Sequence, residues 1–251
     1  MAPAPTIGKL GKLPVRTDVR TLALARYVDT AKLPPPPPQL DLTAHVAAWP
    51  MYDNDTIGDC TIAAAGHMIE AWTAAAHGQA VEVSDQAVLT AFDAVKIVDP
   101  ATGEAGAVEL DVLKYWRKTG IGGHLIGAFA RVSTVDEQLV RSGAFLFGGL
   151  YLGLALPLTA QQQDVWDWTG SLTGPAKPGS WGGHAVDVVG YDATALTVVT
   201  WGSLKQMTWT FWERYVDEAY CLLSSDFLSG DEAPNGFDLA TLKSDLVLVT
   251  A

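Results

Sequence analysis

The sequence predicts an α+β fold in which a helical lobe comes first, an antiparallel β lobe follows, and a cleft lies between them. Three observations support this prediction. The chain of 251 residues is 49% hydrophobic, which is enough for a large core in one domain or in two small lobes. Helical periodicity dominates up to about residue 122, and the alternation typical of strands dominates from residue 123 onward.

A basic arm opens the chain. Residues 1–32 carry a net charge of +4, whereas residues 33–251 carry −16. Apolar residues at Val19, Leu22 and Tyr27 give a loose helical pattern over residues 17–32, which stops before the five prolines of residues 34–38. Such a run is stiff and extended. We therefore treat residues 1–38 as a basic arm with a proline spacer, and we expect the arm to dock on the acidic body.

Residues 39–122 are predicted to form the mainly helical lobe. The strongest helix begins at Cys60, with Asp59 as the candidate N-cap and Gly78 as the C-cap. Two further helical patterns cover residues 84–95 and 109–118.

Residues 123–251 are predicted to form the mainly β lobe. We expect a strand over 124–133, a short capped helix over 134–141 and a buried strand over 145–156. A hairpin follows, with strands at 184–191 and 195–201, and the β pattern continues over 207–211. Residues 161–181 form a loop rich in Gly, Pro and Trp. Its Trp166, Trp168 and Trp181 either line the cleft or cover the core.

Composition excludes several classes of protein. Two cysteines, Cys60 and Cys221, are too few for a disulfide scaffold or a four-cysteine zinc site, and a net charge of −12 disfavours nucleic acid as a partner. The uncharged stretch of residues 142–163 has an apolar centre of about 15 residues, shorter than the ~20 that cross a membrane. The first residues lack the apolar stretch of a secretory signal. We therefore expect a cytoplasmic protein that contacts neither membrane nor nucleic acid; the oligomeric state stays open.

Cys60 and His184 are the candidate reactive pair. A thiol at the start of a helix has its pKa lowered by unpaired backbone N–H groups, which produces a nucleophile. The alternative is a small buried apolar residue, which Cys221 resembles more closely. A thiolate needs a base. His67 lies seven residues along the same helix, roughly 10 Å away and out of reach. His184 follows Gly-Gly, a sign of close backbone approach, and opens the predicted hairpin; the alternative is a core histidine.

Four motifs in order resemble papain-like cysteine peptidases over residues 40–215. They are Leu40-Asp-Leu-Thr with the following Ala-Trp-Pro, Asn54-Asp-Thr-Ile-Gly-Asp-Cys60-Thr-Ile-Ala, Gly182-Gly-His184-Ala-Val-Asp and Val199-Thr-Trp201-Gly202. The resemblance implies a papain-like fold with the active-site cleft between the two lobes, Cys60 as nucleophile and His184 as base. Asn54 stands where the family has an oxyanion-hole Gln. Val199 stands where the family has the Asn that orients the histidine, so the resemblance leaves a Cys–His dyad. Thr200 replaces that Asn only if the strand shifts by one residue.

The resemblance predicts a thiol hydrolase, either a peptidase or an amidase, or else an acyl transferase, acting on a peptide or protein substrate. No metal or organic cofactor is implied. The alternative is a catalytically weak or inactive papain-like protein that binds a peptide or protein, or that serves as a structural component, for instance of a phage-like particle. The arm has the position of a propeptide, although it is shorter than the prosegments of that family.

Overall fold

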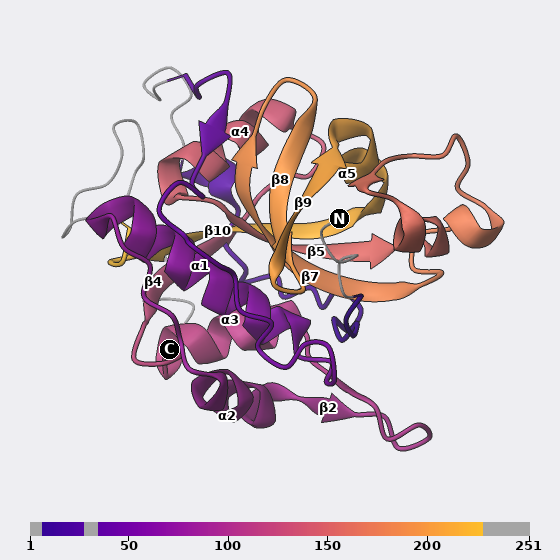
Figure 1. Ribbon diagram of the computed structural model, residues 1–251, viewed down its shortest axis with the longest axis horizontal. Coiled ribbons are helices and arrows are strands. Elements are labelled where there is room, and N and C mark those ends of the chain that lie inside the picture. The colour runs from indigo at the N-terminus through magenta and orange to yellow at the C-terminus, as the bar shows by residue number, and fades with distance from the viewer. Residues whose placement is uncertain (1–6, 28–34, 228–251) are drawn as a thin grey trace.

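The computed structural model describes residues 7–27 and 35–227 of the chain, and these residues have the expected α+β architecture (Figure 1). The helices α1 (Cys60–His77), α2 (Asp85–Val95) and α3 (Glu109–Lys118) gather on one side with the short strands β2 (Ile97–Val98) and β3 (Ala105–Gly106). We call this group the helical lobe. Local signals set its helix ends: Ser84 caps α2 by accepting from the backbone N–H of Ala87, and Gly78 ends α1 in the left-handed conformation.

The β lobe is built on an eight-stranded sheet in the order β4-β10-β5-β7-β8-β9-β6, with β1 paired to β7. All pairs are antiparallel except β6 with β9. The strands are β1 (Leu40–Asp41), β4 (Ile126–Arg131), β5 (Leu150–Leu156), β6 (Val165–Trp166), β7 (Gly182–Tyr191), β8 (Ala195–Thr200), β9 (Ser203–Thr208) and β10 (Val216–Ser224).

Helices cover both faces of the sheet. On β5, Leu150, Leu152 and Leu154 belong to a core shared with α4 (Glu137–Phe147) and α5 (Trp209–Tyr215). Tyr151 between them faces the helical lobe, where its hydroxyl donates to the carbonyl oxygen of Thr61 at 2.8 Å. A strand buried on both faces is apolar along its whole length. Burial on both faces explains why residues 142–163 carry no charge. Among the described residues, no helix is both long and apolar enough to cross a membrane.

Several predicted elements need correction. Helix α4 continues to Phe147, where the sequence predicted that a strand had already begun at residue 145. Residues 209–215 form helix α5 and not a continuation of the β pattern. Within residues 17–27 the expected arm helix is reduced to one 3₁₀ turn, Leu24–Arg26, and residues 28–32 lie outside the described part. In each case tertiary packing decides the outcome over local periodicity.

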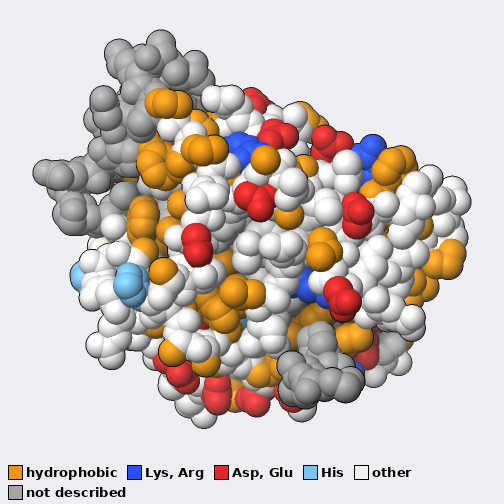
Figure 2. Space-filling model, turned by 45° about the horizontal axis from the view of Figure 1, so that its top comes forward, with side chains coloured by type: hydrophobic (Ala, Val, Ile, Leu, Met, Phe, Trp, Pro, Cys, Tyr) orange, Lys and Arg blue, Asp and Glu red, His pale blue; other side chains and the backbone are white. Residues whose placement is uncertain are grey.

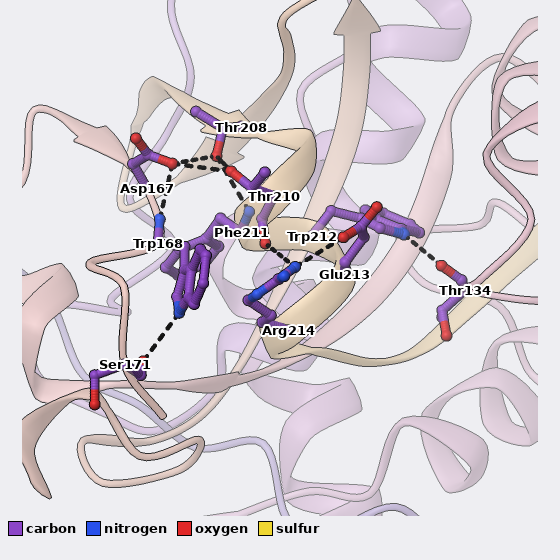
Figure 3. A network of polar contacts seen from close by, with 10 residues as sticks. All are labelled: Thr134, Asp167, Trp168, Ser171, Thr208, Thr210, Phe211, Trp212, Glu213 and Arg214. Atoms are coloured by element: carbon purple, nitrogen blue, oxygen red, sulfur yellow. Dashed lines mark hydrogen bonds and ion pairs between the residues drawn. The ribbon is translucent and has the colours of Figure 1, made fainter. Parts of the chain in front are cut away.

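The long loop between β5 and β7 is fastened to α5 (Figure 3). The carboxylate of Asp167 accepts hydrogen bonds from the hydroxyls of Thr208 at 2.7 Å and Thr210 at 3.1 Å. The guanidinium of Arg214 lies 4.2 Å from the centre of the Trp168 ring. These contacts hold the loop against α5.

The basic arm docks on the acidic body. At its surface, the guanidinium of Arg16 lies 2.6 Å from the carboxylate of Asp111, whereas in the pair of Asp18 with Lys114 at 3.2 Å the arm supplies the acidic partner. Figure 2 shows one face of the molecule, on which acidic side chains are spread widely and Lys and Arg are few. A positively charged arm is therefore attracted to this body over a broad area.

Candidate active site

Cys60 is the first residue of α1, and the loop before it is held by two left-handed residues. Tyr52 and Asp53 have φ values of 55° and 61°, a conformation that is costly outside glycine. Tyr52 is kept there because its hydroxyl donates to Glu70 of α1 at 2.6 Å. Its ring also packs on Gly66, where an added Cβ would lie 2.6 Å from the ring. The loop and α1 therefore form one unit that fixes the backbone N–H of Cys60.

His184 lies near the start of β7, and its ring is held on two sides. Its Nε2 is 2.7 Å from Oγ1 of Thr200, the last residue of β8. The indole of Trp201 stacks on the imidazole, with centroids 4.6 Å apart and planes at 25°. Trp201 and Gly202 have φ values of 47° and 68° and connect β8 to β9 as a two-residue turn. His184 Nδ1 is buried and has no hydrogen-bond partner within the described residues.

Thr200, and not Val199, meets the imidazole. The motif alignment placed Val199 at the orienting position, but the Val199 side chain is buried in a small apolar cluster with Ala71 and Val189. Neighbouring residues of a strand point to opposite faces, so only one of the two can face His184. The hydroxyl of Thr200 supplies the polar contact that valine lacks.

Residues 8–13 of the arm run between the two lobes. The N–H of Lys12 donates to the carbonyl of Gly183 in β7 at 3.1 Å. On the opposite side, the N–H of Leu13 donates to the carbonyl of Ala107 at 2.9 Å, and the N–H of Ala107 donates to the carbonyl of Gly11 at 2.9 Å. This segment therefore bonds to both lobes through its backbone, in the way that an extended peptide binds in a cleft.

The first residues of the same segment are bound equally closely. The N–H of Lys9 donates to the carbonyl of Asn54 at 2.6 Å, and Nε1 of Trp201 donates to the carbonyl of Lys9 at 3.2 Å. A Cβ on Gly11 would lie 1.7 Å from the carbonyl oxygen of Gly58, so only glycine fits there. Cys60 is consequently covered: its exposed fraction is 1%.

The buried thiol is protonated, contrary to the expectation from its place at a helix start. Burial raises the pKa of Cys60 to about 12, although the backbone amides of Ala185 and Gly11 near the sulfur favour the thiolate. Burial likewise lowers the pKa of His184 to about 3, with the charge of His67 acting in the same direction. Desolvation thus outweighs the helix dipole at Cys60. With the arm in place, both groups are neutral at neutral pH.

Asn54 lies in the same site, but its amide is engaged. Nδ2 of Asn54 donates to the carbonyl of Ile57 at 3.1 Å. Burial raises the pKa of the neighbouring Asp59 carboxyl to about 7, while the Asn54 side chain acts in the opposite direction. Asp59 occupies the N-cap position of α1 without a side-chain capping bond. An oxyanion role for Asn54 requires its amide to leave Ile57.

Sequence reasoning missed the carboxylates that receive the Lys12 side chain. Nζ of Lys12 lies 2.9 Å from Asp217 and 3.1 Å from Glu218, and the carboxylate of Glu109 is close enough to influence its pKa. Glu109 lies on α3 whereas the other two lie on β10, so no motif links them. The Gly182-Gly183 pair was a usable sequence signal for the close approach of another backbone at this point of β7. A Cβ on Gly183 would lie 2.1 Å from the Lys12 carbonyl oxygen.

Of the three loop tryptophans, Trp166 is a core residue. Its ring is 1% exposed and stacks on Phe211 with centroids 5.8 Å apart. Trp181 is half-buried and lies 5.5 Å from Trp201, the residue that covers the imidazole. Trp168 lies against Arg214 on the outer side.

The fold is similar to several solved cysteine proteases. Xylellain, a cysteine protease from Xylella fastidiosa, is 16% identical with a TM-score of 0.60, over 89% of this chain and 98% of that one. ProCathepsin B S9 from Trypanosoma congolense is 14% identical with a TM-score of 0.58, over 86% of each chain. The cysteine protease CMS1MS2 from Carica candamarcensis is 16% identical with a TM-score of 0.51, over 74% of this chain and 98% of that one.

No protein-family model matches the chain, and no curated protein is similar to it in sequence. The structural likeness nevertheless extends over most of the described residues. The chain therefore has a divergent papain-like fold, as the sequence motifs predicted.

Proposed function

We propose that this papain-like chain is a thiol hydrolase, a peptidase or amidase, produced in a closed form in which its own arm fills the cleft. The observation that carries the proposal is the path of residues 8–13, which bond through their backbone to Gly183 on one side and Ala107 on the other. A cleft that holds an extended peptide segment beside a cysteine and a histidine is suited to peptide substrates. Two of the similar structures are proforms by name, proCathepsin B and procathepsin L 3.

In the proposed mechanism, displacement of the arm admits water and removes the desolvation that keeps both groups neutral. In the open form His184 Nδ1, which has no hydrogen-bond partner within the described residues of the closed form, comes within reach of the Cys60 sulfur and takes its proton, while Nε2 keeps its contact with Thr200. The sulfur attacks the substrate carbonyl carbon, and the backbone N–H of Cys60 and the released Asn54 amide stabilise the oxyanion. His184 then protonates the departing amine. Water hydrolyses the acyl-enzyme, or an acceptor amine replaces water in an acyl transfer.

A second candidate function is supported by the burial of Lys12, whose side chain is 1% exposed. A side chain buried this deeply is also consistent with an arm that stays in the cleft as a permanent part of the fold. The protein would then be an inactive papain-like protein that acts as a binding or structural component, with Cys60 remaining inert.

One experiment separates the two candidates. A site for a specific protease is inserted after Val19, which is fully exposed in the arm, and the folded chain is cut and diluted so that the severed fragment dissociates by mass action. A peptide mixture is then incubated with the intact protein, the cut protein and a cut Cys60→Ala variant. Mass spectrometry follows cleavage of the peptides and alkylation of Cys60.

The hydrolase predicts that peptides are cleaved only by the cut protein that retains Cys60. A cut protein that remains folded, has lost the fragment, exposes an alkylatable Cys60 and cleaves nothing would instead establish the second candidate. Activity that persists in the Cys60→Ala variant would remove the nucleophile from the mechanism.

A further inference from the structure

The side chain of Lys12 enters a pocket that is unusually acidic for the interior of a protein. The pocket is formed by Glu109 from α3 and by Asp217 and Glu218 from β10, and we call it the carboxylate pocket. Glu109 and Glu218 are each 0% exposed. A buried carboxylate is costly unless a cation accompanies it or it takes up a proton, and burial raises the pKa of Glu109 well above its usual value. The remaining negative charge of the pocket favours a positively charged occupant.

The shape of the pocket also fits a lysine side chain. A Cβ on Gly153 of β5 would lie 1.9 Å from Cε of Lys12, so the absence of a side chain at this position leaves room for the lysine methylenes. The same Cβ would lie 2.9 Å from Oε1 of Glu109. The methylene groups of Lys12 thus pack against the backbone of Gly153, and its ammonium group contacts Asp217 and Glu218.

An independent observation shows that the pocket has capacity for a ligand. Both carboxylate oxygens of Glu109 are buried without a hydrogen-bond partner within the described residues, whereas Oε1 of Glu218 is in an ion pair with Nζ of Lys12 at 3.1 Å. The other oxygen of Glu218 accepts from the hydroxyl of Tyr220 at 2.7 Å, which fixes the orientation of that carboxylate. A fixed carboxylate beside unpaired buried oxygens is arranged for a cation with several donors, and the ammonium group of lysine has three.

The pocket opens from the peptide path through the cleft. The backbone of Lys12 is bonded to Gly183, the residue before His184, while its side chain enters the pocket. Any peptide that follows the same path past Cys60 therefore presents one side chain to Glu109, Asp217 and Glu218. We propose that the carboxylate pocket is the specificity site of the enzyme, that it selects peptide substrates with a lysine side chain at one fixed position, and that Lys12 occupies it in the closed form. This inference rests on the proposed hydrolase function.

The first test measures binding without requiring catalysis. In the full chain, Lys12→Met removes the occupant, and Arg16→Met is the matched control because it removes the surface pair with Asp111. We expect alkylation of Cys60 to accelerate at least about tenfold in Lys12→Met, since an unpaired buried carboxylate cluster destabilises the docked arm. Arg16→Met should stay within about twofold, because exposed pairs contribute little.

A synthetic peptide that copies residues 8–15 is then added to the Lys12→Met protein. It should protect Cys60 again, whereas the same peptide with norleucine in place of the second lysine should not. Equal protection by both peptides would overturn the inference, because the pocket would then not distinguish a lysine side chain from an uncharged side chain of similar length. If Lys12→Met does not fold, the protein cut after Val19 serves in its place.

The second test measures selectivity. The opened protein is incubated with a mixed peptide library, and the cleavage sites are mapped by mass spectrometry, with Glu218→Gln as the pocket variant and Asp111→Asn as the control carboxylate. We expect lysine to be enriched at one fixed position relative to the cut, and the enrichment to fall at least about tenfold in Glu218→Gln only. Cleavage without lysine enrichment overturns the inference and leaves the hydrolase intact. Lysine-dependent protection without any cleavage keeps the pocket but overturns the hydrolase.

Discussion

At the scale of single residues, the hydroxyl of Thr200 is the main departure from what the motifs led us to expect. It meets His184 Nε2 at 2.7 Å, in a place where the alignment put the aliphatic Val199. The indole of Trp201 stacks on the imidazole beside this contact. Because the contact holds the imidazole ring in one orientation, Thr200 is a positioning residue for the proposed base.

Replacing Thr200 by valine tests this role. The substitution keeps the shape of the side chain and removes the hydroxyl, so we expect the opened enzyme to lose at least about tenfold in kcat, or roughly 1.4 kcal/mol in the activation free energy. Thr200→Ser is the control and should stay within about threefold. Nitrogen chemical shifts of the His184 ring report the hydrogen bond at Nε2, and unchanged shifts in Thr200→Val would contradict this role for Thr200.

Glu70 predicts a pH dependence of stability. Burial raises the pKa of Glu70 to about 8, so the folded state binds a proton that the unfolded state releases above its ordinary pKa near 4.5. The free energy of unfolding therefore falls as pH rises between these values, by up to about 1.4 kcal/mol per pH unit. Between pH 6.5 and 8 the unfolded state also releases protons from His67 and His184, whose pKa values are lowered in the folded state, and this adds an opposing slope that is common to the two proteins compared.

The measurement compares urea unfolding of the wild type with that of Glu70→Gln from pH 6.5 to 8. Glutamine resembles the protonated carboxyl and still accepts from Tyr52, so the variant should lose less stability over this range. Parallel curves for the two proteins would show that Glu70 is ionised in the folded state.

At the scale of elements, prediction from sequence worked best where local and tertiary signals agree. The helix that starts at Cys60 and ends at Gly78, the helix of residues 109–118 and the β7–β8 hairpin are confirmed. Prediction was wrong where neighbours override periodicity: α4 extends to Phe147 because its apolar face packs on the sheet. The carboxylate pocket could not be predicted from the sequence, because Glu109 and Glu218 are distant in the sequence and come together only in the folded chain.

The cleft-bound segment of the arm provides an element-scale prediction. Gly11→Ala places a Cβ against the carbonyl of Gly58, so the segment cannot keep its path, while the two lobes are left unchanged. We expect Cys60 to become alkylated at least about tenfold faster at neutral pH. Pro14→Ala, at an exposed position of the same arm, is the control. Equal rates in both variants would mean that the arm does not protect the thiol.

At the scale of the whole molecule, the arm and the body carry opposite charge, but the two kinds of contact between them differ in their response to salt. Pairs such as Arg16 with Asp111 are exposed and are screened by ions, whereas the pair of Lys12 with Glu218 is buried. We therefore expect 1 M NaCl to change the rate of Cys60 alkylation by less than about threefold. An increase of about tenfold or more would show that surface charge, and not the buried anchor, holds the arm.

The covalent continuity of the arm with the rest of the chain also limits what a substrate can do. A tethered segment competes at an effective concentration that is typically millimolar, so a free lysine peptide at micromolar concentration cannot displace Lys12 from the carboxylate pocket. The closed form is therefore insensitive to the supply of substrate. If the arm is removed by proteolytic cleavage, the fraction of open molecules equals the fraction that has been cleaved. Because cleavage is not reversed, that fraction stays open after the cleaving protease is gone.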